Sequence, residues 1–440
     1  MTRSKRWTSV VALLAGGALV GCGSDPSPLA PGRLVQSSLP RITDPQVSAP
    51  DRASQTQGNT AFAFDCYRRL AAQEGNVFYS PLSVSLALAM TWAGARTTTE
   101  EQMAAALQFK LTQERLHPYF NALDLELDSR GQGSQGKDGG KFRLRVVNAL
   151  WGQEGFEFLP SFLDVLAQHY GAGLSLLNFS KPEEAADAIN NWIAQQTEER
   201  IPKLLTPEMV QGAALVLTNA VYFNAAWEHQ FKKSETLDGS FRLGSGQTTI
   251  VPMMRQDASF RVGSGALLRC GATRCPGSGY SAIELPYDGG QLAMLILLPE
   301  AQLSTLEANL NPSSLATILD SLTEQNVALQ MPRWAFRSRV LSLTEPLTAL
   351  GMKDAFLPQQ ADFSGMDGKR DLFVSAVAHQ AFVAVDEAGT EAAAATSVII
   401  GVTAAPVAPV PFVVDQPFLY LIRDIPTGAI LFVGRTVDPR

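Results

Sequence analysis

The sequence predicts an α+β domain, in which helices come first and the strands of large antiparallel or mixed sheets follow. Two observations predict this class. Helical periodicity is concentrated in the first half of the chain, whereas dense apolar runs of strand length are concentrated in the second half. We find no internal repeat. Helices followed by strands are typical of an α+β arrangement rather than of alternating β–α units.

Local patterns predict the individual elements. Apolar residues recur at helical spacing over 59–70, 83–94, 160–170 and 182–198. The Thr-Thr-Thr-Glu run at 97–100 is expected to cap a further helix that ends at Leu107. Strands are predicted where apolar residues are dense, over 143–151, 215–223, 292–298, 328–331, 418–422 and 429–434. The glycine-rich stretch 131–140 is predicted to be a loop.

The N-terminal residues are typical of an export signal. Arg3, Lys5 and Arg6 precede an apolar run, 10–20, that is too short to span a bilayer comfortably. The run ends in Leu-Val-Gly-Cys, which resembles a bacterial lipobox cleaved before Cys22. An ordinary signal peptide with an incidental cysteine is the alternative. We expect a lipoprotein signal over 1–21, lipidation of Cys22, and an outer-membrane or cell-surface location.

Composition changes after Cys22. Pro, Ser, Gln and Gly dominate, and apolar periodicity is absent until about residue 58. This composition predicts a flexible tether over 22–58 that holds a folded domain, 59–440, away from the membrane. The folded part is long enough for a large core and, by length alone, for two domains.

Charge and motif content exclude several function classes. The formal net charge is -7, which disfavours nucleic-acid binding. The sequence contains no phosphate-binding loop, dinucleotide fingerprint, zinc-protease motif or nucleophile elbow. His379 could suggest a hydrolytic triad, but it lies in an apolar run, where a buried and hydrogen-bonded histidine is expected instead. We predict neither an enzyme nor a cofactor or metal site.

The cysteines that follow Cys22 have two expected roles. Cys270 and Cys275 flank a short loop in a glycine-rich insertion, and export favours their oxidation to a local disulfide. Metal binding is the alternative, although no histidine lies near enough in sequence to complete a site. Cys66 lies within the first predicted helix and is expected to be a buried thiol.

The most informative segment lies about fifty residues from the C-terminus. An acidic, glycine-broken stretch leads into four alanines, and no charge appears from Ala392 to Val414. As a strand, this segment would place small, uncharged residues on one face: Thr390, Ala392, Ala394 and Thr396. The alanines also favour a helix, and a flexible linker is a further alternative. A segment that suits more than one conformation is suited to a switch.

Blocks along most of the chain resemble the serpins, a family of suicide inhibitors of proteases. They include, in chain order, Asn-Val-Phe-Tyr-Ser-Pro at 76–81, Asn-Ala-Leu-Trp at 148–151, Leu-Thr-Asn-Ala-Val-Tyr-Phe at 217–223, Asp-Gln-Pro-Phe at 415–418 and Leu-Phe-Val-Gly-Arg at 431–435. The resemblance runs from about residue 59 to 439. It implies one serpin domain with an exposed reactive-centre loop.

The resemblance also assigns roles to residues. It implies a hinge, where the loop starts to enter the main sheet, formed by Glu387, Gly389, Thr390, Glu391, Ala392, Ala393, Ala394, Ala395 and Thr396. It implies a shutter, a hydrogen-bonded cluster beneath the main sheet, formed by Ser80, Ser83, Asn219 and His379. Trp227 matches the aromatic residue at the end of the sheet where insertion begins.

The function that the resemblance implies is irreversible inhibition of a serine protease. The protease would attack the loop and form an acyl-enzyme, and insertion of the loop would trap it. Family spacing places the scissile bond at Thr403–Ala404, within a window that also includes Val402, Ala405 and Pro406. All these residues are small, which predicts an elastase-like or subtilisin-like target. A non-inhibitory serpin that acts as a membrane-anchored binding protein is the alternative.

The resemblance and the charge pattern together predict the partners. Some serpins bind polyanions through a basic helix, but the segment at the expected place, 123–128, is acidic. We therefore expect no heparin-like cofactor. The expected partners are a target protease in a covalent complex and a membrane reached through the N-terminal lipid, with a monomeric chain.

Overall fold

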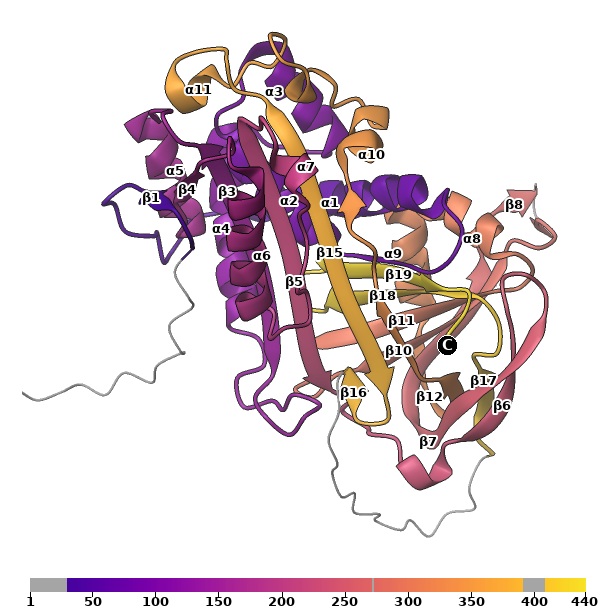
Figure 1. Cartoon of the computed structure of the whole chain (residues 1–440). Helices are drawn as coiled ribbons and strands as arrows, with labels where there is room; N and C mark the ends of the chain where they lie inside the picture. The colour runs from indigo at the N-terminus through magenta and orange to yellow at the C-terminus, as the bar shows by residue number, and fades with distance from the viewer. Residues whose placement is uncertain (1–29, 271–272, 391–407) are drawn as a thin grey trace, which may run out of the picture.

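The computed structural model describes residues 30–270, 273–390 and 408–440 (Figure 1). The predicted signal peptide and Cys22 lie outside these residues. So do the hinge positions from Glu391 to Thr396 and the predicted scissile bond.

The main sheet runs through the centre of the molecule. Its strand order is β1 (Arg33–Val35), β4 (Leu174–Leu177), β3 (Arg143–Gln153), β5 (Leu215–Ala226), β16 (Gly389–Thr390), β15 (Val374–Asp386) and β13 (Trp334–Arg337), and β14 (Leu341–Ser342) also pairs with β15. β3 and β5 are antiparallel, whereas β5 and β15 are parallel. The long strands β5 and β15 therefore lie side by side in the middle of this sheet (Figure 1).

The second sheet lies beside one end of the main sheet. It contains β17 (Val410–Val413), β12 (Thr323–Pro332), β7 (Thr248–Ala266), β10 (Gly279–Pro286), β11 (Leu292–Pro299), β18 (Phe418–Asp424), β19 (Ile430–Thr436) and β2 (Val77–Tyr79), with β6 (Leu237–Arg242) paired to β7. A small hairpin, β8 (Arg269–Cys270) and β9 (Thr273–Arg274), projects from the end of β7. The strands predicted from apolar runs all lie within these two sheets.

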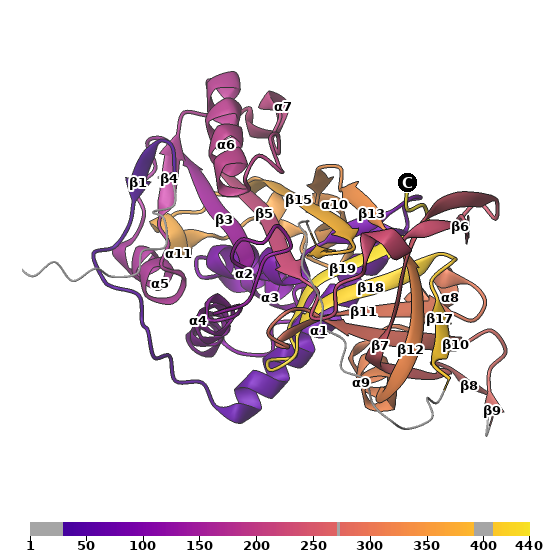
Figure 2. The ribbon, with the colours of Figure 1, turned by 90° about the horizontal axis from the view of Figure 1, so that it is seen from below.

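Helices cover both faces of the main sheet. The described helices are α1 (Ala49–Ala71), α2 (Pro81–Trp92), α3 (Thr97–Ala106), α4 (Gln113–Asp128), α5 (Pro160–Tyr170), α6 (Pro182–Gln196), α7 (Pro207–Val210), α8 (Leu303–Asn309), α9 (Pro312–Ser321), α10 (Thr344–Ala349) and α11 (Ser364–Asp367), with short 3-10 turns at Lys233–Glu235 and Asp354–Phe356. Of these, α8 and α9 contact strands of the second sheet. Figure 2 shows α2 and α6 on opposite faces of β5.

Alternation along β5 explains this layering. Leu217 and Val221 pack in the large core that contains α2, whereas Val216 and Ala220 pack in a smaller core with α6. Successive side chains of a strand point to opposite faces, so a strand covered on both faces is expected to be rich in apolar residues along its whole length. All twelve residues of β5 are buried. This is why its sequence is mostly apolar, and its polar residues Thr218, Asn219 and Asn224 are buried as well.

The predicted cap at 97–100 is wrong. α3 begins at Thr97 after the N-cap residue Arg96, whose side chain makes no capping hydrogen bond to the helix. The threonine hydroxyls bind a neighbouring loop instead. Thr97 donates to the carboxylate of Asp362 at 2.8 Å, and Thr99 accepts from the Asp362 amide at 2.9 Å. A tertiary contact has therefore replaced the local capping bonds that the sequence suggested.

The predicted flexible tether is wrong from residue 33 onward. β1 adds a strand to the free edge of β4. Further along this N-terminal strap, which we define as residues 33–48, Arg41 donates to Asn121 at 2.9 Å and pairs with Asp124 at 2.6 Å on α4. α1 then begins at Ala49, ten residues before the predicted start. The polar composition therefore reflects hydrogen bonds to the body of the protein rather than disorder.

The predictions for Cys66, Cys270 and Cys275 are confirmed. Cys270 and Cys275 form a disulfide that closes the β8–β9 hairpin. Cys66 is a buried thiol on α1, and burial raises its pKa to about 12. Such a thiol remains protonated and poorly nucleophilic at neutral pH. Among the described residues, no helix is both long and apolar enough to cross a membrane.

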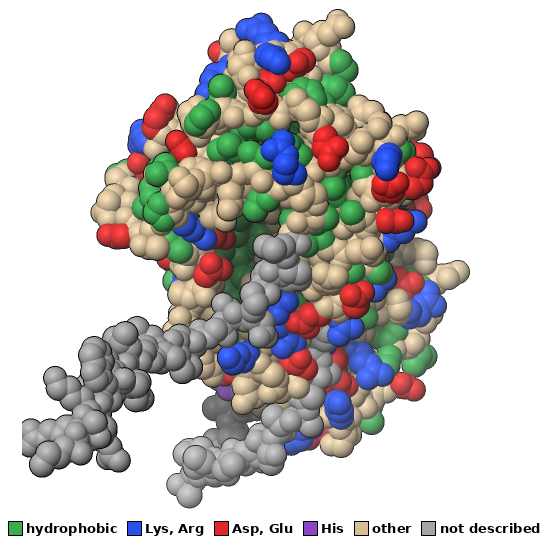
Figure 3. All heavy atoms as spheres, turned by 60° about the vertical axis from the view of Figure 1, so that its left-hand side comes forward, with side chains coloured by type: hydrophobic (Ala, Val, Ile, Leu, Met, Phe, Trp, Pro, Cys, Tyr) green, Lys and Arg blue, Asp and Glu red, His purple; other side chains and the backbone are tan. Residues whose placement is uncertain are grey.

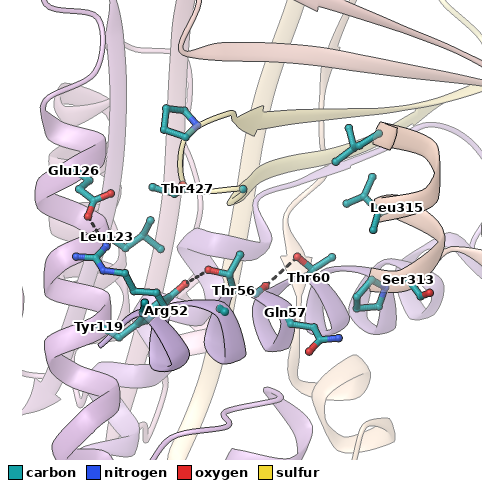
Figure 4. A pocket seen from close by; sticks show the side chains of 17 residues that line it. Arg52, Thr56, Gln57, Thr60, Tyr119, Leu123, Glu126, Ser313, Leu315 and Thr427 are labelled. Carbon is teal, nitrogen blue, oxygen red and sulfur yellow. Dashed lines mark hydrogen bonds and ion pairs between the residues drawn. The ribbon is translucent and has the colours of Figure 1, made fainter. Parts of the chain in front are cut away.

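A pocket of about 690 Å³ lies between α1, α4, α9 and the turn that joins β18 to β19 (Figure 4). Arg52 and Glu126 form an ion pair on its wall, and the hydroxyls of Thr56 and Tyr119 are 3.1 Å apart. None of the described hinge or shutter residues lines this pocket.

Candidate functional site: the seam between β5 and β15

The hinge begins inside the main sheet. After β15 the chain turns back, and β16 lies between β5 and β15 (Figure 1). β16 is antiparallel to both neighbours, with Thr390 opposite Val385 of β15 and opposite Ala225 of β5. The first two residues of a strand inserted at the seam between β5 and β15 are therefore already in place.

An aromatic pair holds Thr390. Its side chain is buried, and its hydroxyl lies 3.0 Å from that of Tyr287. The Tyr287 ring stacks on Trp227 with 4.6 Å between ring centroids. The indole N–H of Trp227 donates to the carbonyl of Asp386 at 3.0 Å. Trp227, predicted to lie where insertion begins, therefore contacts both the end of β15 and the residue that supports Thr390.

Two further hinge residues have identifiable reasons for their type. A side chain at Gly389 would place its Cβ 2.2 Å from the carbonyl oxygen of Ala225, so β16 can lie this close to β5 only with glycine there. Glu387 is buried at the turn, where its carboxylate accepts from the Thr236 hydroxyl at 2.7 Å and lies 3.8 Å from the Arg333 guanidinium. These contacts fix the turn from which β16 starts.

Away from β16, the two strands of the seam contact each other directly. β5 and β15 pair directly from Leu215 and Val374 at one end to Val221 and Ala381 at the other. Beyond that level, 222–226 and 382–386 part around β16. Among the described strands, β5 and β15 are thus separated by β16 at the hinge end and are paired directly over the rest of the seam.

The four predicted shutter residues come together with a fifth residue, Asn148. Ser80 caps α2, Ser83 lies in its first turn, and Asn148, Asn219 and His379 lie side by side on β3, β5 and β15. The Asn219 amide donates to the Ser83 hydroxyl and to the Asn148 side-chain oxygen. His379 bonds through Nδ1 to the Asn219 side-chain oxygen. All these groups are buried or half-buried, so each needs the partners it has.

The histidine is a single neutral tautomer. The amide of Ser80 donates to Nε2 of His379 at 3.1 Å, so Nε2 is the acceptor and Nδ1 carries the hydrogen that binds Asn219. Burial lowers the pKa of His379 to about 3. Of the bonds in this cluster, the one between His379 and Asn219 crosses the seam, whereas the others join each strand to α2 or to β3. Separation of β5 and β15 would therefore break the bond between His379 and Asn219, while α2 contacts one strand through Ser80 and the other through Ser83.

β16 lies between β5 and β15, and a buried polar cluster links these two strands further along the seam. Both features agree with the family expected from the sequence. The family described as "Serpin (serine protease inhibitor)" matches residues 57–439. The chain belongs to the serpin family. Serpins are described as inhibitors of proteases, so this serpin is an inhibitor rather than an enzyme.

Relatives match almost the whole domain. This serpin is 39% identical to "Leukocyte elastase inhibitor" of Sus scrofa, over 87% of this chain and 98% of that protein. It is 37% identical to a serpin-like protein of Thermococcus kodakarensis, over 86% of this chain and 84% of that one. Among solved structures, the thermophilic serpin tengpin in its native state superposes with a TM-score of 0.76 at 25% identity, covering 92% of this chain and 97% of that one.

The other end of the reactive loop is anchored in the second sheet. β17 pairs in parallel with β12. β16 and β17 both lie at the same end of the molecule (Figure 1). The predicted scissile bond belongs to the intervening part of the chain, outside the described residues.

The acidic segment 123–128 forms the end of α4, and two of its acids are already paired. Asp124 pairs with Arg41 and Glu126 with Arg52. On the face drawn in Figure 3, basic and acidic side chains are interspersed. That this serpin needs no polyanionic cofactor stays a prediction.

Sequence reasoning missed two residues of the seam. Asn148 belonged to a recognised block, and its position directly opposite Asn219 could have been inferred by aligning the strands 143–151 and 215–223. Lys137, which is buried beside the hinge, lies in the stretch predicted to be a simple loop. No sequence pattern marks it, because its burial depends on how that loop folds back over the sheet.

Proposed function

We propose that this serpin traps a serine protease by inserting the N-terminal part of its reactive loop into the seam between β5 and β15. The single observation that carries the proposal is β16, which lies between these strands and is hydrogen-bonded to both. Cleavage of the loop would release the chain after Thr390, so that β16 could grow residue by residue down the seam.

The two registers of β16 support this path. Each further residue would pair one position further down both neighbours. Extension of the β15 register places Thr396 opposite His379, and extension of the β5 register independently places Thr396 opposite Asn219. Thr396 would lie on the same strand face as Thr390, toward α2. Its hydroxyl would therefore reach the shutter cluster at the bond that must divide.

The same registers give the length of the inserted strand. Thr403, the residue before the predicted scissile bond, would lie opposite Leu372 and Gly212, just beyond the first residues of β15 and β5. A protease esterified at this position would be carried along the full length of the main sheet. Distortion of its oxyanion hole would slow deacylation, since loss of one donor alone typically costs about 100- to 1,000-fold in rate.

Energetics favour insertion once the loop is cut. Each new backbone hydrogen bond contributes about 1 kcal/mol net, and small side chains on the buried face give little resistance. About a dozen inserted residues thus contribute roughly 10 kcal/mol before the cost of ordering them. The intact protein would be a metastable form whose lifetime depends on a kinetic barrier.

The target class follows from the residues around the predicted bond. Val402, Thr403, Ala404, Ala405 and Pro406 are all small, which suits the pocket of an elastase-like or subtilisin-like protease. The names of several relatives, which describe inhibitors of leukocyte elastase, agree with this specificity.

The test is incubation with an elastase-like protease. We expect a covalent complex that survives SDS and a released peptide that begins near Ala404, identified by mass spectrometry. Thr390→Arg should convert the inhibitor into a substrate, because it would bury a charge against Tyr287. Ala408→Arg, an exposed change at the other end of the loop, is the matched control and should retain the complex. Cleavage of the wild type without a complex would instead favour a non-inhibitory binding protein.

We also propose that Cys22 carries lipid and holds the inhibitor at the outer membrane or cell surface. The lipobox-like sequence supports this location. Replacement of Cys22 by serine should move the protein from the membrane fraction to the soluble fraction of its host. If both forms fractionate alike, the anchor is absent.

A further inference from the structure

The loop 131–140, between α4 and β3, folds over the hinge end of β5 (Figure 1). The amide of Ala226 donates to the Gln135 carbonyl at 3.1 Å, and the amide of Lys137 donates to the Asn224 side-chain oxygen at 2.8 Å. Gly136 allows this approach, because a Cβ there would lie 2.8 Å from the same Asn224 oxygen. The loop is thus fixed to β5 by backbone and side-chain bonds.

The Lys137 side chain reaches from this loop to β15. It is 2% exposed. Its ammonium donates to the Ala384 carbonyl at 3.1 Å and to Oδ2 of Asp386 at 3.0 Å. Because the amide of Lys137 is bound to β5 and its ammonium to β15, one residue joins the two strands at the level where they part.

The Ala384 carbonyl lies next to the part of β15 that pairs with β16, which is Val385 and Asp386. The Ala381 carbonyl accepts from the Ser338 amide at 3.0 Å, on the β13 side of β15. Backbone groups alternate in direction along a strand, so the Ala384 carbonyl, three residues on, faces β5. The ammonium therefore takes the place of a strand partner at this half-buried carbonyl, which would otherwise lack one.

The Asp386 carboxylate holds together the turn from which β16 starts. Its Oδ1 accepts from the Ala388 amide at 3.0 Å, while its Oδ2 is bound by Lys137. The amide of Trp227 donates to the Ala388 carbonyl at 3.0 Å, and its indole donates to the Asp386 carbonyl, also at 3.0 Å. The turn is thus fixed on one side by Trp227, which follows β5, and on the other by Lys137 through Asp386.

We propose that Lys137 is a positioning residue for the hinge: it joins β15 to β5 where the strands part, and it orients the Asp386 carboxylate around which the turn before β16 is built. Without Lys137, the Asp386 carboxylate and the Ala384 carbonyl lose a shared donor. The turn and β16 then separate from β5 more readily. The inference concerns the intact protein, and its consequence for trapping a protease rests on the proposed function.

The charges around the ammonium give this contact a pH dependence. Burial lowers the pKa of Lys137 to about 8, although the carboxylates of Asp386 and Glu387 oppose this shift, and the Arg200 guanidinium adds a like charge. In water a lysine side chain has a pKa of about 10.4. Opening that exposes the ammonium therefore takes up a proton between about pH 8 and 10.4, so rising pH in this range favours the closed contact.

Hydrogen–deuterium exchange of the intact protein tests the contact. The readout is the exchange rate of the backbone amides of 382–390, which contain the end of β15, the turn and β16. The amides of 374–381, which lie in the ladder with β5, are the internal reference. Lys137→Met should raise exchange in 382–390 about tenfold relative to this reference, as for loss of one charge-assisted bond.

A double-mutant cycle shows whether Lys137 acts through Asp386. Asp386→Asn removes the charge that the ammonium pairs with, but keeps a side-chain oxygen that can accept from the Ala388 amide. We expect Asp386→Asn to raise exchange in 382–390. We expect the double variant to exchange no faster than Lys137→Met alone. Additive effects would mean that the two residues act independently, and would overturn the inference.

Controls separate positioning from a general effect on the fold. Lys141→Met changes an exposed lysine of the same loop and should leave exchange unchanged. Lys137→Arg keeps a cationic donor and should exchange like the wild type at neutral pH. From about pH 7.5 to 9.5, the protection of the wild type relative to Lys137→Met should rise several-fold, whereas that of Lys137→Arg should stay constant, because arginine does not titrate. A role in packing alone would give the wild type a constant ratio.

A second readout separates this inference from the proposed function. With an elastase-like protease, Lys137→Met should lower the fraction of loop cleavages that end in a covalent complex. If Lys137→Met exchanges like Lys141→Met, or if exchange rises equally in 374–381, the inference is wrong whether or not the wild type forms complexes. If the wild type forms no complex but the exchange results hold, the inhibitory function fails and Lys137 still positions the hinge.

Discussion

The two ends of the β5–β15 seam differ in what holds them together. At the shutter end, 215–221 and 374–381 are joined by a direct parallel ladder and by the bond between His379 and Asn219. At the hinge end, β16 and the Lys137 side chain lie between the strands instead. Growth of β16 therefore breaks little at its start and most at the shutter. If the intact serpin is metastable, as we propose, its barrier to insertion is accordingly expected over the ladder and the polar cluster.

The largest expected effect is at the hinge end. Gly389→Val places a branched side chain against the Ala225 carbonyl and should expel β16 from the seam. We expect the yield of SDS-resistant complex to fall more than about tenfold, with cleavage of the loop unimpaired. Ala408→Val, at the exposed end of the loop, should leave the yield unchanged. An equal yield from both variants would show that β16 is not where insertion starts.

The next largest effect is at the shutter end. His379→Gln removes a buried group that bonds both Ser80 and Asn219, and should lower the free energy of unfolding of the intact protein by about 2 kcal/mol. It should also speed spontaneous loss of inhibitory activity on warming, because the bond that crosses the seam is gone. Denaturant titration and a timed activity assay measure the two effects. Lower stability without faster inactivation would place the barrier elsewhere.

The same histidine makes the shutter sensitive to acid. Its pKa is about 3 in the folded protein and about 6.5 when unfolded, so only the unfolded chain takes up this proton between those values. Stability is full above pH 6.5 and falls as pH drops toward 3, by about 1.4 kcal/mol per pH unit from this group. His117, whose pKa is also lowered to about 3 by burial, adds a second such loss. His379→Gln should therefore flatten the acid limb without abolishing it.

A smaller effect tests the residue that the sequence did not reveal. Asn148→Ala leaves the Asn219 amide with one partner fewer and should cost about 1 kcal/mol in the intact protein. Asn326→Ala, on an exposed position of β12, is the control and should change stability by less than half as much. If the two variants unfold at the same denaturant concentration, Asn148 is not part of the shutter.

The smallest effect lies away from the seam. Arg41→Ala removes the strap's ion pair with Asp124, both partly exposed, and should cost at most about 1 kcal/mol. Because the strap binds α4 and β4 rather than β5 or β15, the loss should be equal in the intact and the loop-cleaved protein. A cost confined to the intact form would mean that the strap also restrains the seam.

The parts of the fold that follow local rules were predictable from the sequence. β5 is mostly apolar because both of its faces are covered, and its bounds were predicted within a few residues. The start of α1 was not, because Gln55 and its neighbours look like linker residues. In the structure Gln55 is fully buried and accepts from the Lys110 amide at 2.8 Å. Polar residues satisfied by distant partners carry no local signature.

The site shows the same division. The resemblance identified Ser80, Asn219 and His379, and the structure brings them together. It could not identify Lys137, which lies in a loop bonded to Asn224 of β5 and donates from its ammonium to the Ala384 carbonyl of β15. Pairing between a loop and a strand edge depends on three-dimensional alignment, which a single sequence does not reveal.

The folded strap has a consequence for how far this serpin can stand from a bilayer. If Cys22 is acylated, as we propose, only the ten residues 23–32 separate the lipid from β1, which begins at Arg33. Ten extended residues span about 35 Å, whereas the 36 residues of the tether expected from composition would span more than 100 Å. The inhibitor would then act only on proteases that come close to the membrane that carries it. Proteases further from that membrane would not be inhibited.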